Sequence, residues 1–388
     1  MKKSTKRIVI AGAIVAVILV AYFSLPRYAQ RALIYQKVGI DDYSLFANRE
    51  VAVGTPQEWE SDTKLADYTL DAAMLEKFNE WQTIAFLVIK DKKVIFEQYW
   101  DGYSAQSLTN SFSMAKSIVG FLVGAAIDDG FIQSIDEPVA KFIKEFDTPT
   151  NKDLTLRQVL TMSSGLNWDE SYGSLFNTTT EAYYGTAIKD LIYSLQVVEK
   201  PGFEFKYLSG NTQLLAMVVE AATGKHVADY AAEKFWKPMG AVNPALWCLD
   251  SENGTEKAYC CFNSNARDFA RWGQLVLNQG TWNGDTLLSP EYVRQAVSPA
   301  AYLLDETGNP IDYYGFQWWI QQLDGNPVPY MRGILGQYVF VLPHENAVVV
   351  RLGHKRSEER KNHHTMDSFF YLETAKQLLN DYKKESTL

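Results

Sequence analysis

The chain has 388 residues, of which 47% are hydrophobic and 21% are charged, and its formal net charge is -9. A chain of this length and apolar content can bury a large core, which excludes an intrinsically disordered protein. The acidic balance argues against a nucleic-acid partner, because phosphate backbones bind to basic surfaces. The length predicts one large domain or two intertwined ones.

The first 26 residues differ from the rest of the chain. Basic residues at positions 2, 3, 6 and 7 precede an apolar run from Ile8 to Leu25. About 20 apolar residues are enough to cross a bilayer, and the preceding positive charges predict a cytoplasmic N-terminus. No A-x-A cleavage site follows the run, so we expect an uncleaved anchor, with a cleaved signal peptide as the alternative. Both interpretations predict that the remaining chain is exported to the periplasm or the cell exterior.

The anchor is followed by a segment with weak structural signals and then by a long folded region. Residues 27–80 are expected to form a polar, irregular lead-in, and residues 81–388 a single domain. Alternating β-branched and aromatic residues from Ala85 to Trp100 predict a hairpin. The strongly apolar segment from Ser113 to Asp129 predicts a buried central helix, which a glycine then ends.

The second half of the domain changes from helical to strand patterns. Residues 136–300 are mostly helical in pattern, and a last amphipathic helix is expected at about 365–382. Three strands are predicted between them, at Tyr314–Gln321, Gln337–Leu342 and Ala347–Leu352. Strands at both ends with helices between them indicate an α+β fold. Its mostly antiparallel sheet would be built from both chain ends, flanked by helices, with a helical region inserted.

Ser113 and Lys116 are three residues apart at the start of the apolar helix, so they share one helix face. A hydroxyl is a poor nucleophile until a base removes its proton, and lysine can be that base when burial lowers its pKa. The helix N-terminus adds N–H groups and a positive dipole end, which suit an oxyanion. A second Ser-x-x-Lys, at Ser61 and Lys64, lies in a polar stretch where nothing desolvates the amine. The competing interpretation of Ser113 is a helix-capping serine with a solvated lysine beside it.

Further blocks follow this pair in a fixed order. They are Leu156–Leu166, Pro201–Leu215, Glu256–Gly273 and Gly333–Gln337. Together they resemble the penicillin-recognising serine hydrolases, which include class C β-lactamases, DD-peptidases, family VIII esterases and 6-aminohexanoate-dimer hydrolases. The resemblance runs from about residue 80 to residue 380 and is strongest to the 6-aminohexanoate-dimer hydrolase branch. It implies a β-lactamase/transpeptidase-like fold.

The resemblance implies roles for three side chains. Ser113 matches the acylated nucleophile, Lys116 its general base, and Tyr207 the residue that relays a proton to the leaving group. The positive charge of Lys116 is expected to favour the Tyr207 phenolate. An alternative alignment uses the Ser209–Asn211 segment and puts a serine in the place of the tyrosine. A packed core tyrosine is the competing interpretation of Tyr207.

The resemblance also implies an oxyanion hole and a substrate surface. The backbone N–H groups of Ser113 and Ile334 are expected to bind the oxyanion. Gly333 fits beside them, because substrate must lie against the backbone there, although a plain strand-edge glycine is the alternative. Tyr172 is expected over the substrate, with a mobile loop aromatic as the alternative. Asn211 is expected either to orient the substrate or to cap the next helix.

One family feature is missing. No Lys-Thr-Gly or His-Thr-Gly precedes the last strands, and Met331-Arg332-Gly333 occupies that region. The missing triplet normally holds the β-lactam carboxylate, so its loss puts β-lactamase and DD-peptidase activity in doubt. Arg332 either replaces the triplet as an anion contact or is solvated.

The three cysteines, Cys248, Cys260 and Cys261, do not have the spacing of a zinc site. In an exported domain Cys248 could pair with Cys260 or with Cys261. The alternative is that all three are small buried hydrophobes. No metal or cofactor is implied.

These features predict a membrane-anchored serine hydrolase that cleaves a small-molecule amide or ester through an acyl-enzyme on Ser113. Residues 1–26 would be the anchor or signal segment, and residues 81–388 the hydrolase domain. One alternative is a DD-peptidase or β-lactamase that acts on cell-wall peptides or penicillins. The other is a non-catalytic binding or regulatory protein with the same fold. No motif identifies the substrate or the oligomeric state.

Overall fold

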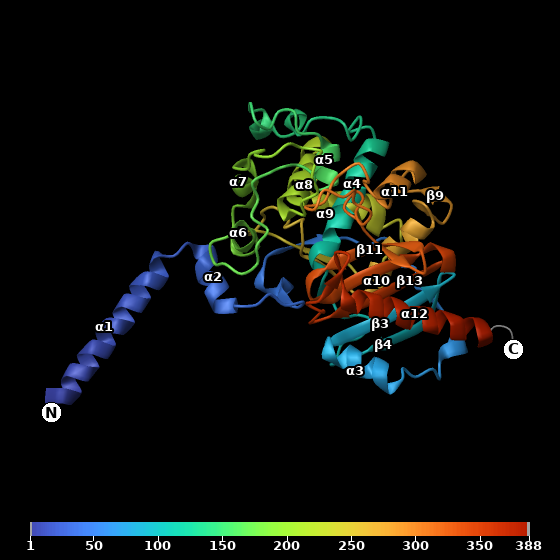
Figure 1. Ribbon diagram of the computed structural model, residues 1–388, viewed down its shortest axis with the longest axis horizontal. Helices are drawn as coiled ribbons and strands as arrows, with labels where there is room; N and C mark the ends of the chain where they lie inside the picture. Colours follow the sequence, from blue (N-terminus) through green and yellow to red (C-terminus); the bar gives the residue numbers. More distant parts are fainter. Residues whose placement is uncertain (1, 386–388) are drawn as a thin grey trace.

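The computed structural model describes residues 2–385, with side chains from residue 5 onward. Helix α1 (Lys2–Ser24) projects away from the folded body (Figure 1). Its segment Thr5–Ser24 has a mean hydropathy of 2.3, and none of it is buried. The helix is therefore long and apolar enough to span a membrane, a property that it shares with signal sequences.

The main sheet is built from both ends of the domain. Among the described residues it has seven strands in the order β10-β11-β12-β13-β3-β4-β2. The strands are β2 (Glu60–Ser61), β3 (Thr83–Lys90), β4 (Lys93–Tyr99), β10 (Trp319–Leu323), β11 (Asn326–Gly333), β12 (Gln337–Leu342) and β13 (Ala347–Gly353). Neighbours pair antiparallel, except that β2 runs parallel to β4. The predicted α+β fold, with its sheet from both chain ends, is confirmed.

Alternate side chains of this sheet face two separate hydrophobic cores, as the period of a strand requires. In β3, Leu87 and Ile89 belong to one core, and Phe86 and Val88 to the other. Helices from opposite ends of the domain cover the second core, whereas α10 packs on the first face (Figure 1). Helices α3 (Ala72–Glu80) and α12 (Met366–Glu385) lie on the second core, and α10 (Ala266–Leu277) lies on the first.

The inserted helical region is organised around α4 (Ala115–Asp128), which is buried from Ala115 to Ala126. Gly130 follows it with φ +78, a left-handed conformation that glycine adopts easily after a helix. Helix α4 packs against α8 (Ser209–Thr223). The surrounding helices are α5 (Leu156–Leu160), α6 (Thr178–Tyr184), α7 (Ile188–Tyr193), α9 (Val227–Ala231), the π-helical turn Ala232–Trp236 and α11 (Pro290–Ala296).

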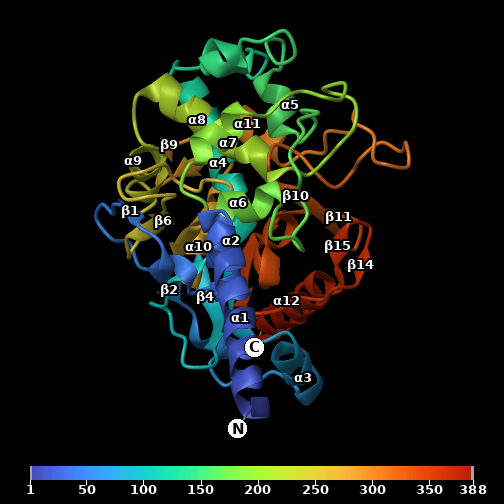
Figure 2. The same cartoon turned by 90° about the vertical axis from the view of Figure 1, so that its left-hand side faces the viewer.

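Residues 27–80 carry more regular structure than their polar sequence indicates. Helix α2 (Arg27–Tyr35) lies against α6 (Figure 2). The described chain also contains a four-stranded sheet in the order β1-β6-β7-β5. Its strands are β1 (Asn48–Val51), β5 (Thr109–Asn110), β6 (Ala245–Cys248) and β7 (Phe262–Ser264). The lead-in therefore supplies an edge strand to the sheet that adjoins Ser113.

Two strand predictions differ from the structure. The strand expected from Tyr314 begins only at Trp319, because Gln317 has φ +63, which an extended strand does not allow. Strand β11 was not predicted, since Pro327 and Pro329 argue against a central strand. Both prolines lie where β11 pairs with β10 alone, so no ladder hydrogen bond to β12 is lost.

A buried ion pair joins the lead-in to α10. Arg271 Nε donates to Asp268 Oδ1 at 2.8 Å, and both side chains are at most 2% exposed. The guanidinium also donates to the carbonyls of Met239 and Gln57. Asp268 in turn accepts from two backbone N–H groups of the loop before β6. The pair thus connects three chain segments inside the protein.

Asp268→Ala is expected to lower the free energy of unfolding by about 3–5 kcal/mol, because Arg271 would stay buried without its counter-ion. Equilibrium unfolding of the full chain by urea in detergent measures the change. Arg294→Ala is the matched control, since it breaks an exposed pair with Glu291 and should cost less than about 1 kcal/mol. Equal losses of unfolding free energy in the two variants would show that the buried pair contributes no more to stability than the exposed one.

Candidate active site

The turn before α4 exposes Ser113 and buries its neighbours. A 3-10 turn, η3 (Phe112–Met114), leads directly into the helix. From Thr109 to Ala126, Ser113 is the one residue that is not buried. Phe112 has φ +44, which is unfavourable for a bulky residue, and its N–H donates to Asn110 Oδ1 at 2.8 Å. Such strain is typical of functional turns.

Lys116 lies one turn further and reaches back to the serine. Its Nζ donates to Ser113 Oγ at 3.1 Å and to the Tyr259 carbonyl oxygen at 2.8 Å. The side chain is almost entirely shielded from solvent. Burial lowers the pKa of Lys116 to about 8, and the charge of Glu170 opposes this shift. The neutral amine that a general base requires is therefore accessible near neutral pH.

Tyr207 completes the group from the loop before α8. Lys116 Nζ lies 5.2 Å from the centroid of its ring, and the Trp319 ring packs against it with 5.4 Å between centroids. Burial raises the pKa of Tyr207, while a hydrogen bond with Ser113 opposes that rise. The expectation of a favoured phenolate is wrong, because desolvation outweighs the nearby positive charges. Burial thus favours the neutral phenol form of Tyr207.

Glu170 is the carboxylate whose charge acts on Lys116 and Tyr207, and no sequence motif indicated it. Its Oε2 accepts the Ser209 N–H at 2.5 Å, and its Oε1 accepts the Ser209 hydroxyl at 2.8 Å. The Tyr172 hydroxyl donates to Oε1 at 2.5 Å. Ser209 is the first residue of α8, where a negative charge is favoured. In the alternative alignment Ser209 replaces the tyrosine, but in the structure this serine binds Glu170.

Tyr172 and Asn211 have different surroundings. The Tyr172 side chain is 58% exposed, on the loop that carries Glu170. Asn211 is fully buried, accepts from Ser164 Oγ at 2.6 Å and donates to Met162 Sδ at 3.4 Å. The expectation that Asn211 caps a helix is wrong, because α8 begins at Ser209, two residues before it, and it is Glu170 that accepts the first N–H of the helix. Asn211 instead ties the turn at residues 162–164 to α8.

The end of β11 brings Gly333 and Ile334 close to the turn η3, which carries Ser113. Strand β11 packs against η3. A Cβ on Gly333 would lie 2.3 Å from the Ser111 carbonyl oxygen, so only glycine allows this approach. The chain then turns at Ile334–Gly336, where Leu335 has φ +61.

Two buried side chains hold this turn, and no sequence motif indicated either of them. Arg351, on β13, is fully buried and donates to the carbonyls of Leu335 and Gly336 at 3.1 and 2.6 Å. Gln337 Nε2 donates to the Ile334 carbonyl at 3.2 Å. Side chains from strands β12 and β13 therefore hold the carbonyls of residues 334–336 in place.

Arg332 is buried and stacked, so the expectation that it is solvated is wrong. The side chain is 8% exposed, and its guanidinium carbon lies 3.2 Å from the centroid of the Trp319 ring. Its Nη1 donates to the His363 carbonyl at 2.8 Å. The charge also acts on Tyr207, where it opposes the effect of burial on the pKa of the phenol.

All three cysteines are buried, as the alternative expectation has it, but two of them are bonded to each other. Cys260 and Cys261 form a disulfide with each other, and Cys248 is a buried free thiol. The pairing of Cys248 with one of them, given above as a possibility, is wrong, because the two adjacent residues bond together. Burial raises the pKa of Cys248 to about 12, so this thiol stays protonated.

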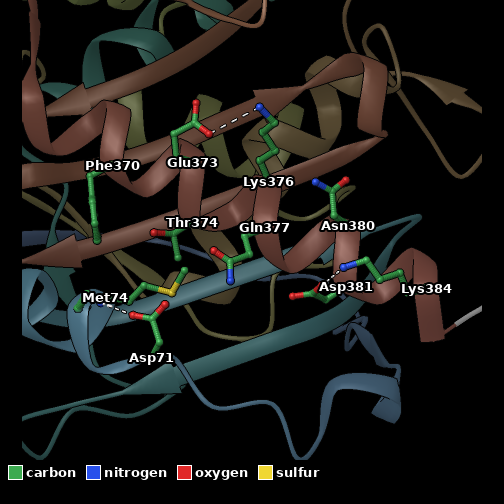
Figure 3. Close-up of a pocket in the computed structure, with 11 residues that line it drawn as sticks. Asp71, Met74, Phe370, Glu373, Thr374, Lys376, Gln377, Asn380, Asp381 and Lys384 are labelled. Carbon is green, nitrogen blue, oxygen red and sulfur yellow. Dashed lines mark hydrogen bonds and ion pairs between the residues drawn. The ribbon is translucent and has the colours of Figure 1, made fainter.

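A surface groove of about 620 Å³ lies elsewhere, between α3 and α12 (Figure 3). It opens on the face of the sheet opposite to α10. Two ion pairs lie at or beside it. Lys376 pairs with Asp324 at 2.6 Å, and Lys384 pairs with Asp381 at 2.8 Å. None of the predicted site residues lines this groove.

Comparisons with known proteins identify the family of the chain. Residues 72–367 match the family model described as Beta-lactamase. The chain is 26% identical over 318 residues to the 6-aminohexanoate-dimer hydrolase of Paenarthrobacter ureafaciens, and the alignment covers 78% of this chain and 80% of that protein.

Solved structures share the fold. A candidate 6-aminohexanoate-dimer hydrolase from Bacillus anthracis has a TM-score of 0.76 at 20% identity, with 89% of this chain and 93% of that one covered. A penicillin binding protein from Bacillus halodurans has a TM-score of 0.61 at 16% identity, with 79% and 99% covered. These likenesses confirm the predicted β-lactamase/transpeptidase-like fold and the predicted resemblance. The chain belongs to the beta-lactamase family.

Proposed function

We propose that this protein is a serine hydrolase that cleaves a small amide or ester through an acyl-enzyme on Ser113. The observation that carries the proposal is the buried Lys116 amine, which is hydrogen-bonded to the Ser113 hydroxyl and has its pKa lowered to about 8. Neutral Lys116 takes the serine proton while Oγ attacks the substrate carbonyl. The relationship to 6-aminohexanoate-dimer hydrolase supports the same reaction class.

The Tyr259 carbonyl orients the base. A neutral amine has a single lone pair, which must face Ser113 Oγ to accept its proton. Donation of one N–H to the Tyr259 carbonyl, 2.8 Å away, restricts the rotation of the amine. The lone pair is then directed toward the hydroxyl, 3.1 Å from Nζ.

The remaining steps use groups that surround the nucleophile. The backbone N–H groups of Ser113 and Ile334 bind the tetrahedral oxyanion, and Gly333 lets the strand come close enough for this contact. Tyr207, kept neutral by burial, donates a proton to the leaving group and is reprotonated by Lys116. Water then cleaves the ester through the same groups in reverse. Tyr172, exposed beside Glu170, contacts the bound substrate.

We place the reaction outside the cytoplasm. The hydropathy of α1, together with its projection from the folded body, supports a membrane anchor (Figure 1). Residues 81–388 then form an exported hydrolase domain, which acts on small molecules near the membrane surface.

A second candidate is a DD-peptidase or β-lactamase, and Arg332 is the observation that favours it. This buried guanidinium lies where the family's carboxylate-binding triplet would be, and it acts on Tyr207. A substrate carboxylate is its natural counter-ion.

Ser113→Ala is expected to lower the hydrolysis of nitrophenyl esters by at least about 10³-fold, because the nucleophile is lost. Labelling by a fluorophosphonate should disappear as well. Ser61→Ala, in the other Ser-x-x-Lys, is the matched control and should behave like the parent protein. Persistent labelling of Ser113→Ala would refute the assignment, and stable labelling of the parent protein by a fluorescent penicillin would favour the second candidate.

The value of kcat/KM is expected to rise about tenfold per pH unit below pH 8 and to level off above it, because only neutral Lys116 accepts a proton. Glu170→Gln removes a charge that raises the pKa of Lys116, so the acid limb should move to lower pH. Glu199→Gln, at an exposed ion pair with Lys206, is the control. An acid limb that stays in place in Glu170→Gln would contradict the electrostatic role of Glu170.

Tyr207→Phe is expected to slow amide hydrolysis by about 10²–10⁴-fold, because the leaving amine needs a proton. Hydrolysis of a nitrophenyl ester should fall much less, since nitrophenolate leaves without protonation. The ratio of the two rates, measured on the same preparation, therefore reports the proton transfer itself. Equal losses for both substrates would assign Tyr207 a packing role instead.

A further inference from the structure

The Cys260–Cys261 disulfide lies in the segment that holds both the base and the nucleophile turn. Immediately before it, the Tyr259 carbonyl accepts from Lys116 Nζ at 2.8 Å. Immediately after it, the Phe262 carbonyl accepts the Ser111 N–H at 2.9 Å. This N–H belongs to the residue two positions before the nucleophile. The bonded dipeptide thus links two carbonyls that contact opposite ends of the Ser-x-x-Lys turn.

The disulfide restricts the backbone of this dipeptide, because a bond between adjacent side chains closes a small ring. Cys261 has φ +69, a left-handed conformation that is unfavourable for a residue with a Cβ. In a chain with two free thiols, no ring enforces this conformation. The backbone on either side of the pair then gains freedom that the oxidised chain does not have.

The dipeptide is also fastened to the four-stranded sheet. The Cys260 carbonyl accepts from Trp247 Nε1 at 3.0 Å, and the Cys261 carbonyl accepts the Cys248 N–H at 3.0 Å. Both sulfur-bearing residues are at most 4% exposed. The ring therefore acts as a stiff support between β6 and the residues around Ser113.

We propose that the Cys260–Cys261 disulfide positions Lys116 through the Tyr259 carbonyl, and that its reduction lowers hydrolase activity. The inference rests on the proposed function of Lys116 as general base. A dithiol reductant breaks the S–S bond, supplies two electrons and two protons to the two sulfurs, and is itself oxidised to a cyclic disulfide. The Tyr259 carbonyl then no longer fixes the amine, and the lone pair loses its alignment with Ser113. An oxidising compartment maintains the active form.

The test measures the rate of Ser113 labelling by a fluorophosphonate, as a function of pH, in the full chain and in Cys260→Ala/Cys261→Ala. Without the ring, the plateau rate is expected to fall about tenfold or more. The acid limb should also move to lower pH, because the carbonyl no longer stabilises the charged ammonium. A purely structural support would lower the amount of folded protein without moving this limb. Cys248→Ala is the matched control, since it removes the neighbouring free thiol and leaves the bond intact.

Wild-type protein reduced with dithiothreitol supplies a second form without the bond, which does not depend on the folding of the double variant. Intact mass confirms the gain of two hydrogens, and circular dichroism confirms the fold. The same slower labelling is expected, with recovery on reoxidation. Unchanged rates and an unchanged acid limb in the reduced protein would overturn the inference while leaving the hydrolase function intact. Absence of Ser113 labelling in the oxidised protein would instead overturn the proposed function, and this inference with it.

Discussion

The candidate site depends on keeping one amine out of water. Lys116 lies at the start of a helix that is buried along almost its whole length. Protonating its amine therefore costs free energy, because water cannot solvate the resulting charge. That cost lowers its pKa to about 8. The neighbouring serine is the one position of the turn that solvent reaches. The other residues of the candidate site surround this pair, a buried Lys116 amine beside a solvent-accessible Ser113 hydroxyl.

The same burial acts in opposite directions on two groups. It makes the neutral form of Lys116 more accessible by lowering its pKa, and it disfavours the charged form of Tyr207 by raising its pKa. Glu170 and Arg332 moderate these effects, since each opposes the shift caused by desolvation at one of the two groups. One apolar environment thus favours the uncharged amine and the uncharged phenol together, the two forms that the proposed proton transfers use.

Strong periodicity made much of the fold predictable, and local conflicts caused the misses. The alternating hairpin, the apolar helix α4 and strands β12 and β13 were recognisable because one face or the whole element is buried. Strand β11 was not, because the prolines that argue against it lie where no partner strand needs their N–H groups. Of the two alternatives for Asn211, the helix cap is wrong, because α8 begins at Ser209, before it.

The sequence by itself determined the reaction class to be tested, since Ser113, Lys116 and Tyr207 carry their chemistry in their side chains and stand in an ordered set of blocks. Only the tertiary structure decided what surrounds them. The Tyr259 carbonyl, the buried Arg351 behind the Ile334 turn and the bond between Cys260 and Cys261 come from segments far along the chain. Backbone carbonyls are present at every residue, and burial is a property of the whole packed molecule. The sequence therefore does not indicate which carbonyl or which charged group will lie beside Lys116.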